Sequence, residues 1–516
     1  MKIRQIIPTL ALLAVALTTN ANSMVDGIVL KRVDISGASV FSNQVLQNAL
    51  PASPGERVYA EDILAMVDAI TELYQKAGYI TSGATLSNQD VSDGVVRIAV
   101  IEGQLTDVAL STTGRLSDAF VRGKVKASTS WPLKLSDLQR AISRLEREET
   151  ISHVKGSLKP GAQRGESTLD LEVIEADAFS ITIGGNNYRG PSVGEGQAEI
   201  ALEHLSLLGR GDRLNLNYQD TDGVDAYSVR YDLPILALNS RIAVYHAKGD
   251  TLVVEEPFNE IALESETDTT GFQLTSAWRD TGSSRVSTII GYEQKESLTT
   301  LLGLPFDFSQ GSRNGITEAS VWSLGVEWAR SGADSGLALR LTGRMGSDEN
   351  EVPSPIGADG DFNVFRLQGQ YVRRLDDAWE LGLGVSIQET SDTLPSFERI
   401  ALGGHDTVRG FRENQLLKDS GLLANARLSV TLLSPENVND LAVKAHLFYD
   451  YGEGENSAEA LNVDTEGDIS SVGVGISAAY GGLKFSLQKA HRLGDKNQLG
   501  DTFQDNGIHM GVNYEF

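Results

Sequence analysis

The last nine residues of the chain read Ile508-His509-Met510-Gly511-Val512-Asn513-Tyr514-Glu515-Phe516. Apolar side chains occupy every second position, and polar residues or glycine occupy the positions between them. Because successive side chains of a β-strand point to opposite faces, this segment predicts a strand with one apolar and one polar face. An apolar face that ends in an aromatic residue is typical of a strand that contacts lipid and lines a wet interior.

The same alternation recurs along the chain from residue 179 onward; Trp322, Leu324 and Val326, for example, alternate with Ser323 and Gly325. Sixteen candidate strands begin near residues 179, 196, 211, 226, 240, 270, 284, 319, 336, 363, 379, 421, 441, 470, 483 and 507. Connections after odd-numbered strands are often long and those after even-numbered strands short, as in bacterial barrels with an even strand number. We therefore predict a mainly β chain whose residues 177–516 form a 16-stranded antiparallel transmembrane β-barrel.

The region before the barrel predicts two small α+β domains, residues 24–103 and 104–176, in which the order β-α-α-β-β occurs twice. The first copy has strands near 29–35, 80–87 and 95–101 and helices near 42–50 and 60–77. The second copy has strands near 105–110, 151–158 and 168–174 and helices near 116–125 and 135–148.

The N-terminal residues predict export. Lys2 and Arg4 precede an apolar run, residues 6–17, and small residues surround a cleavage site after Ala21 or Ser23. This is the pattern of a secretory signal peptide, here residues 1–23. The chain has no cysteine, which excludes disulfide scaffolds and thiolate metal sites. Its net charge of −26 argues against nucleic-acid binding through phosphates.

The sequence shows no recognisable set of catalytic residues. The chain has no G-x-S-x-G, P-loop or H-E-x-x-H motif, and its seven histidines are scattered. A membrane-embedded hydrolase with an outward serine and histidine stays open as a minor alternative. The run Asp220-x-Asp222-Gly223-x-Asp225 lacks the spacing and the final glutamate of a calcium loop and indicates an acidic turn. We predict no enzyme, no catalytic residue, no metal and no cofactor.

The two α+β domains resemble polypeptide-transport-associated (POTRA) domains. The first carries Tyr74-Gln75-Lys76-Ala77-Gly78-Tyr79-Ile80, Asp93-Gly94-Val95-Val96-Arg97-Ile98 and Glu102-Gly103. Leu158-Lys159-Pro160-Gly161 through Leu169-Asp170-Leu171 resembles the end of the second such domain in two-partner secretion transporters. The resemblance implies that these domains capture an unfolded exported chain, partly through an open sheet edge with unpaired backbone groups.

The longest connection, residues 392–420, follows the eleventh candidate strand and is therefore the sixth surface loop. Its motif Val408-Arg409-Gly410-Phe411, preceded by the loop-supporting Gly403 and Gly404, resembles the sixth-loop signature of POTRA-barrel transporters. In that family the loop folds into the barrel, and its arginine pairs with an aspartate of the thirteenth strand. The thirteenth candidate strand carries the matching motif Phe448-x-Asp450-x-Gly452.

The implied pairing makes chemical sense. A forked guanidinium–carboxylate contact satisfies both buried charges, and Gly410 lets the backbone turn beside Arg409. The alternative is a solvated loop arginine and an unrelated acid in the lumen.

The resemblance covers nearly the whole mature chain up to Phe516, which would act as the C-terminal barrel signal. The chain is identified as a member of the two-partner secretion transporters of the haemolysin-activator kind. This implies a place in the Gram-negative outer membrane with the N-terminal domains in the periplasm. The implied partners are a secreted exoprotein (an adhesin or cytolysin), membrane lipid and the barrel-assembly machinery.

Two other functions stay open: an insertase that uses the barrel seam, and a passive porin or surface receptor. Family members often begin with a helix that plugs the pore. Only a few residues separate the expected cleavage site from the first predicted strand, so we expect the folded-in loop to close the pore alone.

Overall fold

The computed structural model describes residues 27–235, 240–281, 283–307, 311–347, 361–434, 440–457, 466–494 and 500–516. The predicted signal peptide lies outside the described residues. The chain divides into two compact units, each described by itself: residues 1–111, 128–143 and 154–173, and residues 112–127, 144–153 and 174–516.

The first α+β region has the predicted order of helices and strands, with one short added ladder. Its elements are β1 (Ile28–Val29), β2 (Arg32–Ser36), α2 (Asn43–Ala49), β3 (Arg57–Val58), α3 (Ala60–Lys76), β4 (Gly83–Leu86) and β5 (Val95–Ile101). The sheet order is β2-β5-β4, and β1 pairs with β3 separately. Helix α3 is amphipathic, and its buried Ile63, Met66, Ile70 and Tyr74 form one face of the core.

The Glu102 carboxylate links three segments of this first domain. Glu102 accepts hydrogen bonds from the backbone N–H groups of Ser39 (2.7 Å) and Val40 (2.9 Å) and from the hydroxyl of Tyr74 (2.7 Å). Burial works against the charge of Glu102, but these hydrogen bonds outweigh it and hold the pKa of Glu102 below its ordinary value. Burial and the bond to Glu102 raise the pKa of Tyr74. Glu102 therefore ties the end of β5 to α3 and to the segment before α2.

The second α+β region repeats the order. Its elements are β6 (Gln104–Thr112), α4 (Asp118–Lys126), α5 (Leu135–Glu146), β7 (Ile151–Pro160) and β8 (Glu166–Glu175), and its sheet order is β6-β8-β7. Ser117 caps α4 by accepting a hydrogen bond from the backbone of Phe120 (3.3 Å). Among the described residues, no helix has both the length and the apolar character needed to cross a membrane.

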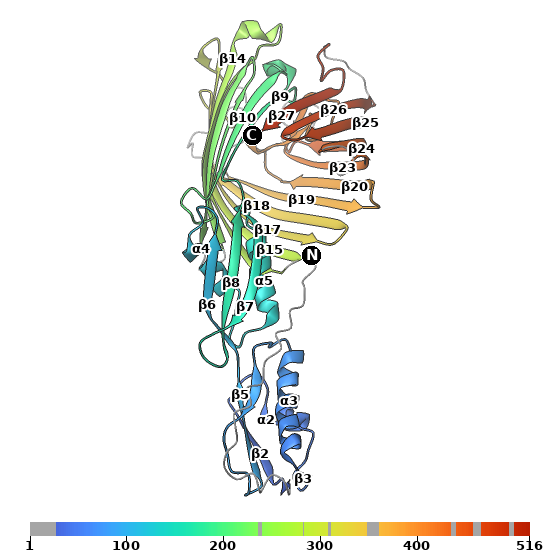
Figure 1. Cartoon of the computed structure of the whole chain (residues 1–516). Helices are drawn as coiled ribbons and strands as arrows, with labels where there is room; N and C mark the ends of the chain where they lie inside the picture. The colour runs from blue at the N-terminus through green and yellow to red at the C-terminus, as the bar shows by residue number, and fades with distance from the viewer. Residues whose placement is uncertain are drawn as a thin grey trace. The chain divides into compact units, whose positions relative to one another are not determined.

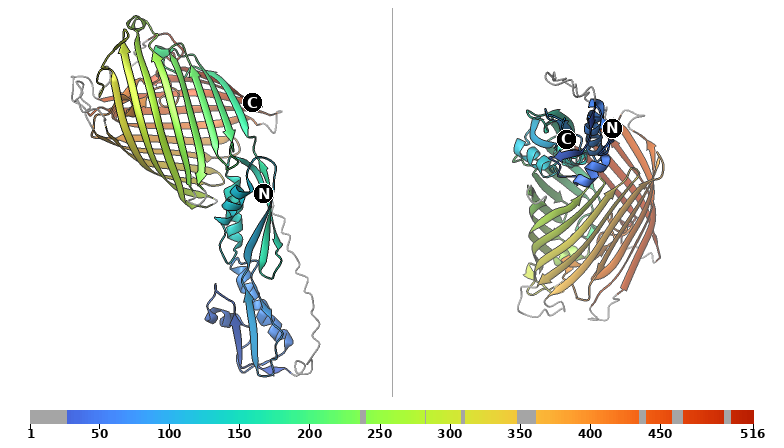
Figure 2. Two further views of the ribbon diagram at one scale, coloured as in Figure 1. Left: turned by 90° about the vertical axis from the view of Figure 1, so that its left-hand side faces the viewer. Right: turned by 90° about the horizontal axis from the view of Figure 1, so that it is seen from below.

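Apart from a short hairpin within residues 400–418, the remaining strands form one closed antiparallel barrel, as predicted (Figures 1 and 2). Its long strands are β9 (Phe179–Asn186), β10 (Gln197–Leu205), β11 (Arg213–Asp220), β12 (Val224–Ile235), β13 (Ser240–Leu252), β14 (Leu263–Asp280), β15 (Ser284–Leu301), β17 (Ile316–Ser331), β18 (Ser335–Ser347), β19 (Phe362–Arg374), β20 (Trp379–Glu389), β23 (Ser420–Leu433), β24 (Leu441–Glu455), β25 (Glu466–Tyr480), β26 (Leu483–Leu493) and β27 (Ile508–Glu515). The two-residue β16 (Leu304–Pro305) only extends β15 within a connection. Pairing of β27 with β9 closes the cylinder.

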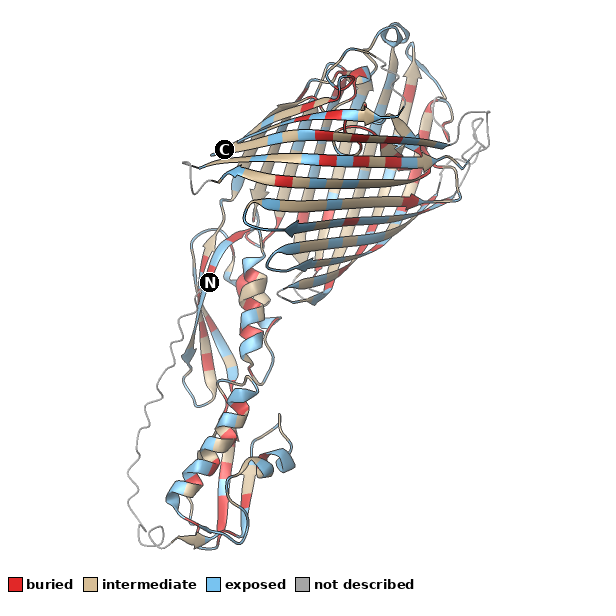
Figure 3. Ribbon diagram, turned by 90° about the vertical axis from the view of Figure 1, so that its right-hand side faces the viewer, coloured by how far each residue is buried: buried red, intermediate tan, exposed pale blue. Residues whose placement is uncertain are grey.

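The predicted alternation separates an outer apolar face from an inner polar face. Along the barrel strands, residues of different burial follow one another (Figure 3). Leu324 is 57% exposed and Trp322 49%, and the Trp322 ring contacts that of Tyr292 on the neighbouring strand at 4.9 Å. On β27, Tyr514 is 44% exposed, whereas His509, on the opposite face, is fully buried. An apolar outer surface around a polar interior is the pattern that a lipid-facing barrel requires.

Candidate functional site

The connection between β20 and β23, residues 390–419, is a folded structure that we call the sixth loop. It contains a short 3-10 helix, η4 (Ser396–Glu398), and a small hairpin of β21 (Ile400–Leu402) and β22 (Leu416–Lys418). Buried apolar side chains of the loop form a cluster with Ile469 of β25. The loop members of this cluster are Ile400, Leu402, Val408 and Phe411. The sixth loop is thus packed against the inner side of the barrel wall.

The structure brings together the two motifs that the sequence singled out. Arg409 Nε and Nη2 each lie 2.7 Å from a different oxygen of Asp450, and the Arg409 backbone N–H donates to the same carboxylate at 3.2 Å. Asp450 is fully buried, and Arg409 is 9% exposed. The Arg409 guanidinium lies 3.5 Å from the ring centroid of Phe448, and Nη1 donates to Gln488 of β26 at 3.1 Å. Three strand side chains therefore hold one loop cation.

Glycines allow this close approach. Gly410 has φ +93°, and a Cβ at this position would lie 2.8 Å from the Ala490 Cβ. Its N–H donates to His509 Nε2 at 3.0 Å, and its carbonyl accepts a hydrogen bond from Arg492. A Cβ on Gly452 would lie 3.0 Å from Val408. A side chain at Gly410 or Gly452 would push the loop away from the wall.

Gly403 and Gly404 shape the turn before the arginine. Their φ angles are +107° and +105°, values that other residues rarely adopt. A Cβ on Gly403 would lie 2.5 Å from the carbonyl oxygen of Arg412, and the Thr407 hydroxyl donates to the Gly403 carbonyl at 2.8 Å.

A second anchor of the loop was missed by the sequence analysis. Glu398, at the end of η4, is fully buried. Its oxygens lie 2.8 Å from Lys295 Nζ of β15, 2.8 and 3.0 Å from the Arg344 guanidinium of β18, and 3.2 Å from that of Arg366 on β19. Glu293 of β15 also binds Arg344, at 2.7 Å. The alternating pattern of β15, β18 and β19 could have indicated three inward-facing cations. Nothing in the sequence indicated which acidic residue of the loop neutralises them.

The loop also contacts two other connections. Arg412 binds Asp505 (2.6 and 2.8 Å) and Glu255 (3.0 and 2.9 Å), which lie in the connections 494–507 and 253–262. Glu413 accepts hydrogen bonds from Arg189 (3.3 Å) and from the backbone of Gly190 (2.8 Å).

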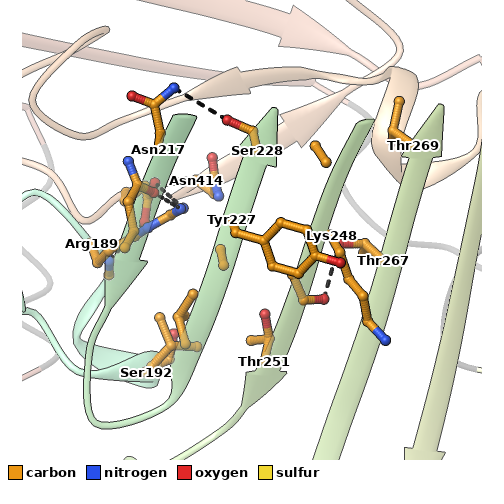
Figure 4. A pocket seen from close by; sticks show the side chains of 18 residues that line it. Arg189, Ser192, Asn217, Tyr227, Ser228, Lys248, Thr251, Thr267, Thr269 and Asn414 are labelled. Atoms are coloured by element: carbon orange, nitrogen blue, oxygen red, sulfur yellow. Dashed lines mark hydrogen bonds and ion pairs between the residues drawn. The ribbon is translucent and has the colours of Figure 1, made fainter. Parts of the chain in front are cut away.

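Two cavities adjoin the sixth loop. The larger, about 630 Å³, lies against β11–β14 and contains side chains of Asn217, Ser228 and Thr267 (Figure 4). The smaller, about 390 Å³, lies between the loop and β9–β11. Both are lined by Arg189, Gln219, Glu413 and Asn414, so they are neighbours.

Two remaining sequence predictions can be placed. Phe516 is 68% exposed, packs against Tyr514 at 4.6 Å and donates its backbone N–H to Ile181 of β9 at 2.9 Å. The acidic run 220–225 forms the hairpin turn between β11 and β12. In the described part of the chain, no group of three or more histidine, aspartate or glutamate side chains is placed to hold a metal ion.

Comparisons with known proteins agree with this architecture. The family model of the haemolysin secretion/activation protein ShlB/FhaC/HecB matches residues 165–478, and the ShlB-type POTRA domain matches residues 28–103. The Haemophilus influenzae heme/hemopexin transporter protein HuxB is 22% identical over 83% of this chain and 76% of its own length. The outer membrane transporter CdiB of Escherichia coli O6:K15:H31 is 26% identical over 78% and 69%. The hemolysin transporter protein ShlB of Serratia marcescens is 26% identical over 78% and 73%.

Solved structures show the same fold. CdiB from Escherichia coli superposes with a TM-score of 0.73 at 19% identity, covering 98% of this chain and 93% of that chain. BamA from Haemophilus ducreyi superposes with a TM-score of 0.53 at 14% identity, covering 95% and 100%. Because the family model spans more than half of the chain, the chain belongs to the haemolysin secretion/activation family, and it is an outer-membrane transporter that moves a partner exoprotein from the periplasm to the cell surface.

Proposed function

We propose that Arg409 and Asp450 set the conformation of the sixth loop that permits passage of the cargo. The observation that carries this proposal is the buried, bidentate contact between them. Separating a buried pair leaves a charge without its partner and costs about 3–5 kcal/mol. The pair therefore keeps the sixth loop docked in that conformation.

The N-terminal domains would hold the cargo while it is unfolded. In the sheet order β2-β5-β4 the outer strands are β2 and β4, and in β6-β8-β7 they are β6 and β7. A sheet edge offers backbone donors and acceptors that an extended peptide of almost any sequence can satisfy. Because the sequence has no nucleotide-binding motif, folding of the cargo outside the cell would give transport its direction.

The cargo class follows from the family. Relatives are described as hemolysin and heme/hemopexin transporters, which supports a large exported adhesin or cytolysin as the partner of this chain. The exposed terminal Phe516 would serve the barrel-assembly machinery during insertion of the transporter itself. Membrane lipid would then contact the outward apolar side chains such as Leu324. No step of this function calls for catalysis.

Co-expression with an exoprotein encoded beside this chain tests the proposal. The cargo should reach the medium or the cell surface with the unaltered transporter and stay periplasmic with Arg409→Ala. Arg330→Ala, which removes a guanidinium from an exposed position on β17, is the matched control and should export normally. Heat-modifiable migration on gels checks that each barrel has folded. Normal export by Arg409→Ala would refute the role of the pair.

The insertase alternative has one supporting observation. Five residue pairs join β27 to β9, whereas eight join β9 to β10 and seven join β26 to β27, so the seam has the shorter ladder. Under this alternative, deletion of the gene would deplete unrelated outer-membrane barrels and leave export of the exoprotein unchanged. Under the transporter proposal, deletion abolishes export and leaves the other barrels at normal levels.

A further inference from the structure

We propose that the cargo crosses the barrel along one side only, next to the inner face of β11–β14, which we call the passage wall. This inference rests on the proposed function, because it assumes that cargo passes through the lumen. The passage wall presents Asn217 from β11, Ser228 from β12, Thr251 from β13, and Thr267 and Thr269 from β14 to the larger cavity (Figure 4).

The first argument is the uneven attachment of the sixth loop. Glu398 fixes one part of the loop to β15, β18 and β19 through Lys295, Arg344 and Arg366. Arg409 fixes another part to β24 and β26, and the Gly410 backbone donates to β27. These anchors are buried and multidentate. The loop is therefore held against β15, β18, β19, β24, β26 and β27. The cavity that remains at β24–β27 is smaller, about 350 Å³, and is lined by Lys444 and Ser477.

The second argument is the space that remains. The cavity on the passage wall measures about 630 Å³, and the neighbouring cavity adds about 390 Å³. An extended residue rises about 3.3 Å and fills a cross-section of roughly 4.8 by 10 Å, or about 160 Å³. The larger cavity alone has room for about four such residues. A short extended segment fits there without dismantling either buried anchor.

The third argument is the chemistry of the passage wall. Hydroxyl and amide side chains both donate and accept hydrogen bonds, so they can solvate a peptide backbone in any register. They are also neutral, and the charged side chains that line the same cavity are those of Arg189, Lys248 and Glu413. The wall around Glu398 instead concentrates three cations and two carboxylates, which would hold charged cargo residues in place.

On the passage side the loop is held by the pair of Arg189 and Glu413 and by Arg412. The side chains of Arg189 and Glu413, which are paired at 3.3 Å, are 30% and 26% exposed. Partly solvated pairs of this kind contribute little. Arg412 also reaches Glu255, in the connection after β13, and this contact has to open for the cargo to leave. A sideways shift of the 412–414 segment, which also separates Arg412 from Asp505, would widen the cavity while Glu398 and Arg409 stay docked.

Disulfide mapping tests the inference, since the chain has no cysteine and every introduced thiol is unique. Ser228→Cys and Thr267→Cys probe the passage wall; Thr342→Cys on β18 and Ser477→Cys on β25 probe inward positions elsewhere. The cargo carries one cysteine and a fused folded domain that stalls it in transit. We expect several-fold more disulfide-linked cargo with the first two variants. Equal or greater linkage at Thr342→Cys or Ser477→Cys would overturn the inference.

A steric test gives a second measurement that does not depend on the reactivity of the introduced thiols. Ser228→Trp should reduce export several-fold, whereas Ser477→Trp should export at the level of the unaltered protein, with heat-modifiable migration confirming both barrels. Export by Ser228→Trp at the unaltered level would contradict a path along this wall. If the unaltered transporter itself exports no cargo, the proposed function fails instead, and the two failures are distinguished by that first measurement.

Discussion

Replacing Glu398 by glutamine should loosen the sixth loop without removing any bulk. The substitution deletes one negative charge and leaves Lys295, Arg344 and Arg366 in a buried site, where three cationic groups had lain within 3.2 Å of the carboxylate. Breaking a buried charge cluster by removing one partner costs about 3–5 kcal/mol. Glu293 stays within 2.7 Å of Arg344 and compensates in part, so we expect about 3 kcal/mol.

That loss has a measurable consequence. At about 1.4 kcal/mol for each tenfold change, the ratio of docked to released loop should fall roughly a hundredfold. Single-channel recordings in planar bilayers should show a larger fraction of open time, and cells should take up hydrophilic antibiotics that are too large for ordinary porins. Glu296→Gln, which removes the same charge from an exposed position on β15, is the control and should leave both quantities unchanged.

The reasoning fails if Glu398→Gln keeps both the conductance and the antibiotic uptake of the unaltered protein while its barrel still migrates as a folded, heat-modifiable species. In that case the glutamine amide or a shift of the three cations would have preserved the docked loop. The anchor could then not be treated as an electrostatic one.

Three further predictions follow from the geometry of individual residues. Gly410→Ala should raise channel opening, because residue 410 has φ +93° and its new Cβ would lie 2.8 Å from the nearest neighbour. Gly336→Ala, whose Cβ meets nothing within 4 Å, is the control and should leave the measured conductance unchanged. Leu324→Arg should weaken barrel folding into vesicles by about 2–4 kcal/mol in a urea titration, and Asn217→Arg, on the inner face, by far less. Because the folded-state pKa of Glu102 is lowered, its stabilising contribution is present above its ordinary pKa and is lost as the pH falls through the lowered value. Hydrogen exchange of the peptide around residue 40, corrected for intrinsic rates, should rise in acid, and Glu102→Gln should abolish that dependence.

The strands were predictable where one face is apolar and the other polar. The first residues of β9, β15 and β27 lie within one residue of the predicted starts at 179, 284 and 507. The prediction failed for β14, which begins at Leu263 rather than near 270, so the connection expected over 251–269 shrinks to 253–262. Residues 264–270 of β14 are polar or charged on both faces, and a strand with two polar faces has no period-two signal.

The sequence by itself determined the cylinder and the two motifs that meet inside it, because strand periodicity and short motifs are local properties of the chain. It could not identify Glu398 as an anchor of the sixth loop, because the partners of Glu398 on β15, β18 and β19 lie 103, 54 and 32 residues away in the chain. Nor could it show that a cavity of about 630 Å³ remains between the docked loop and β11–β14. Both depend on how the closed barrel brings distant strands around one loop, and only the tertiary structure specifies which buried charges neutralise each other.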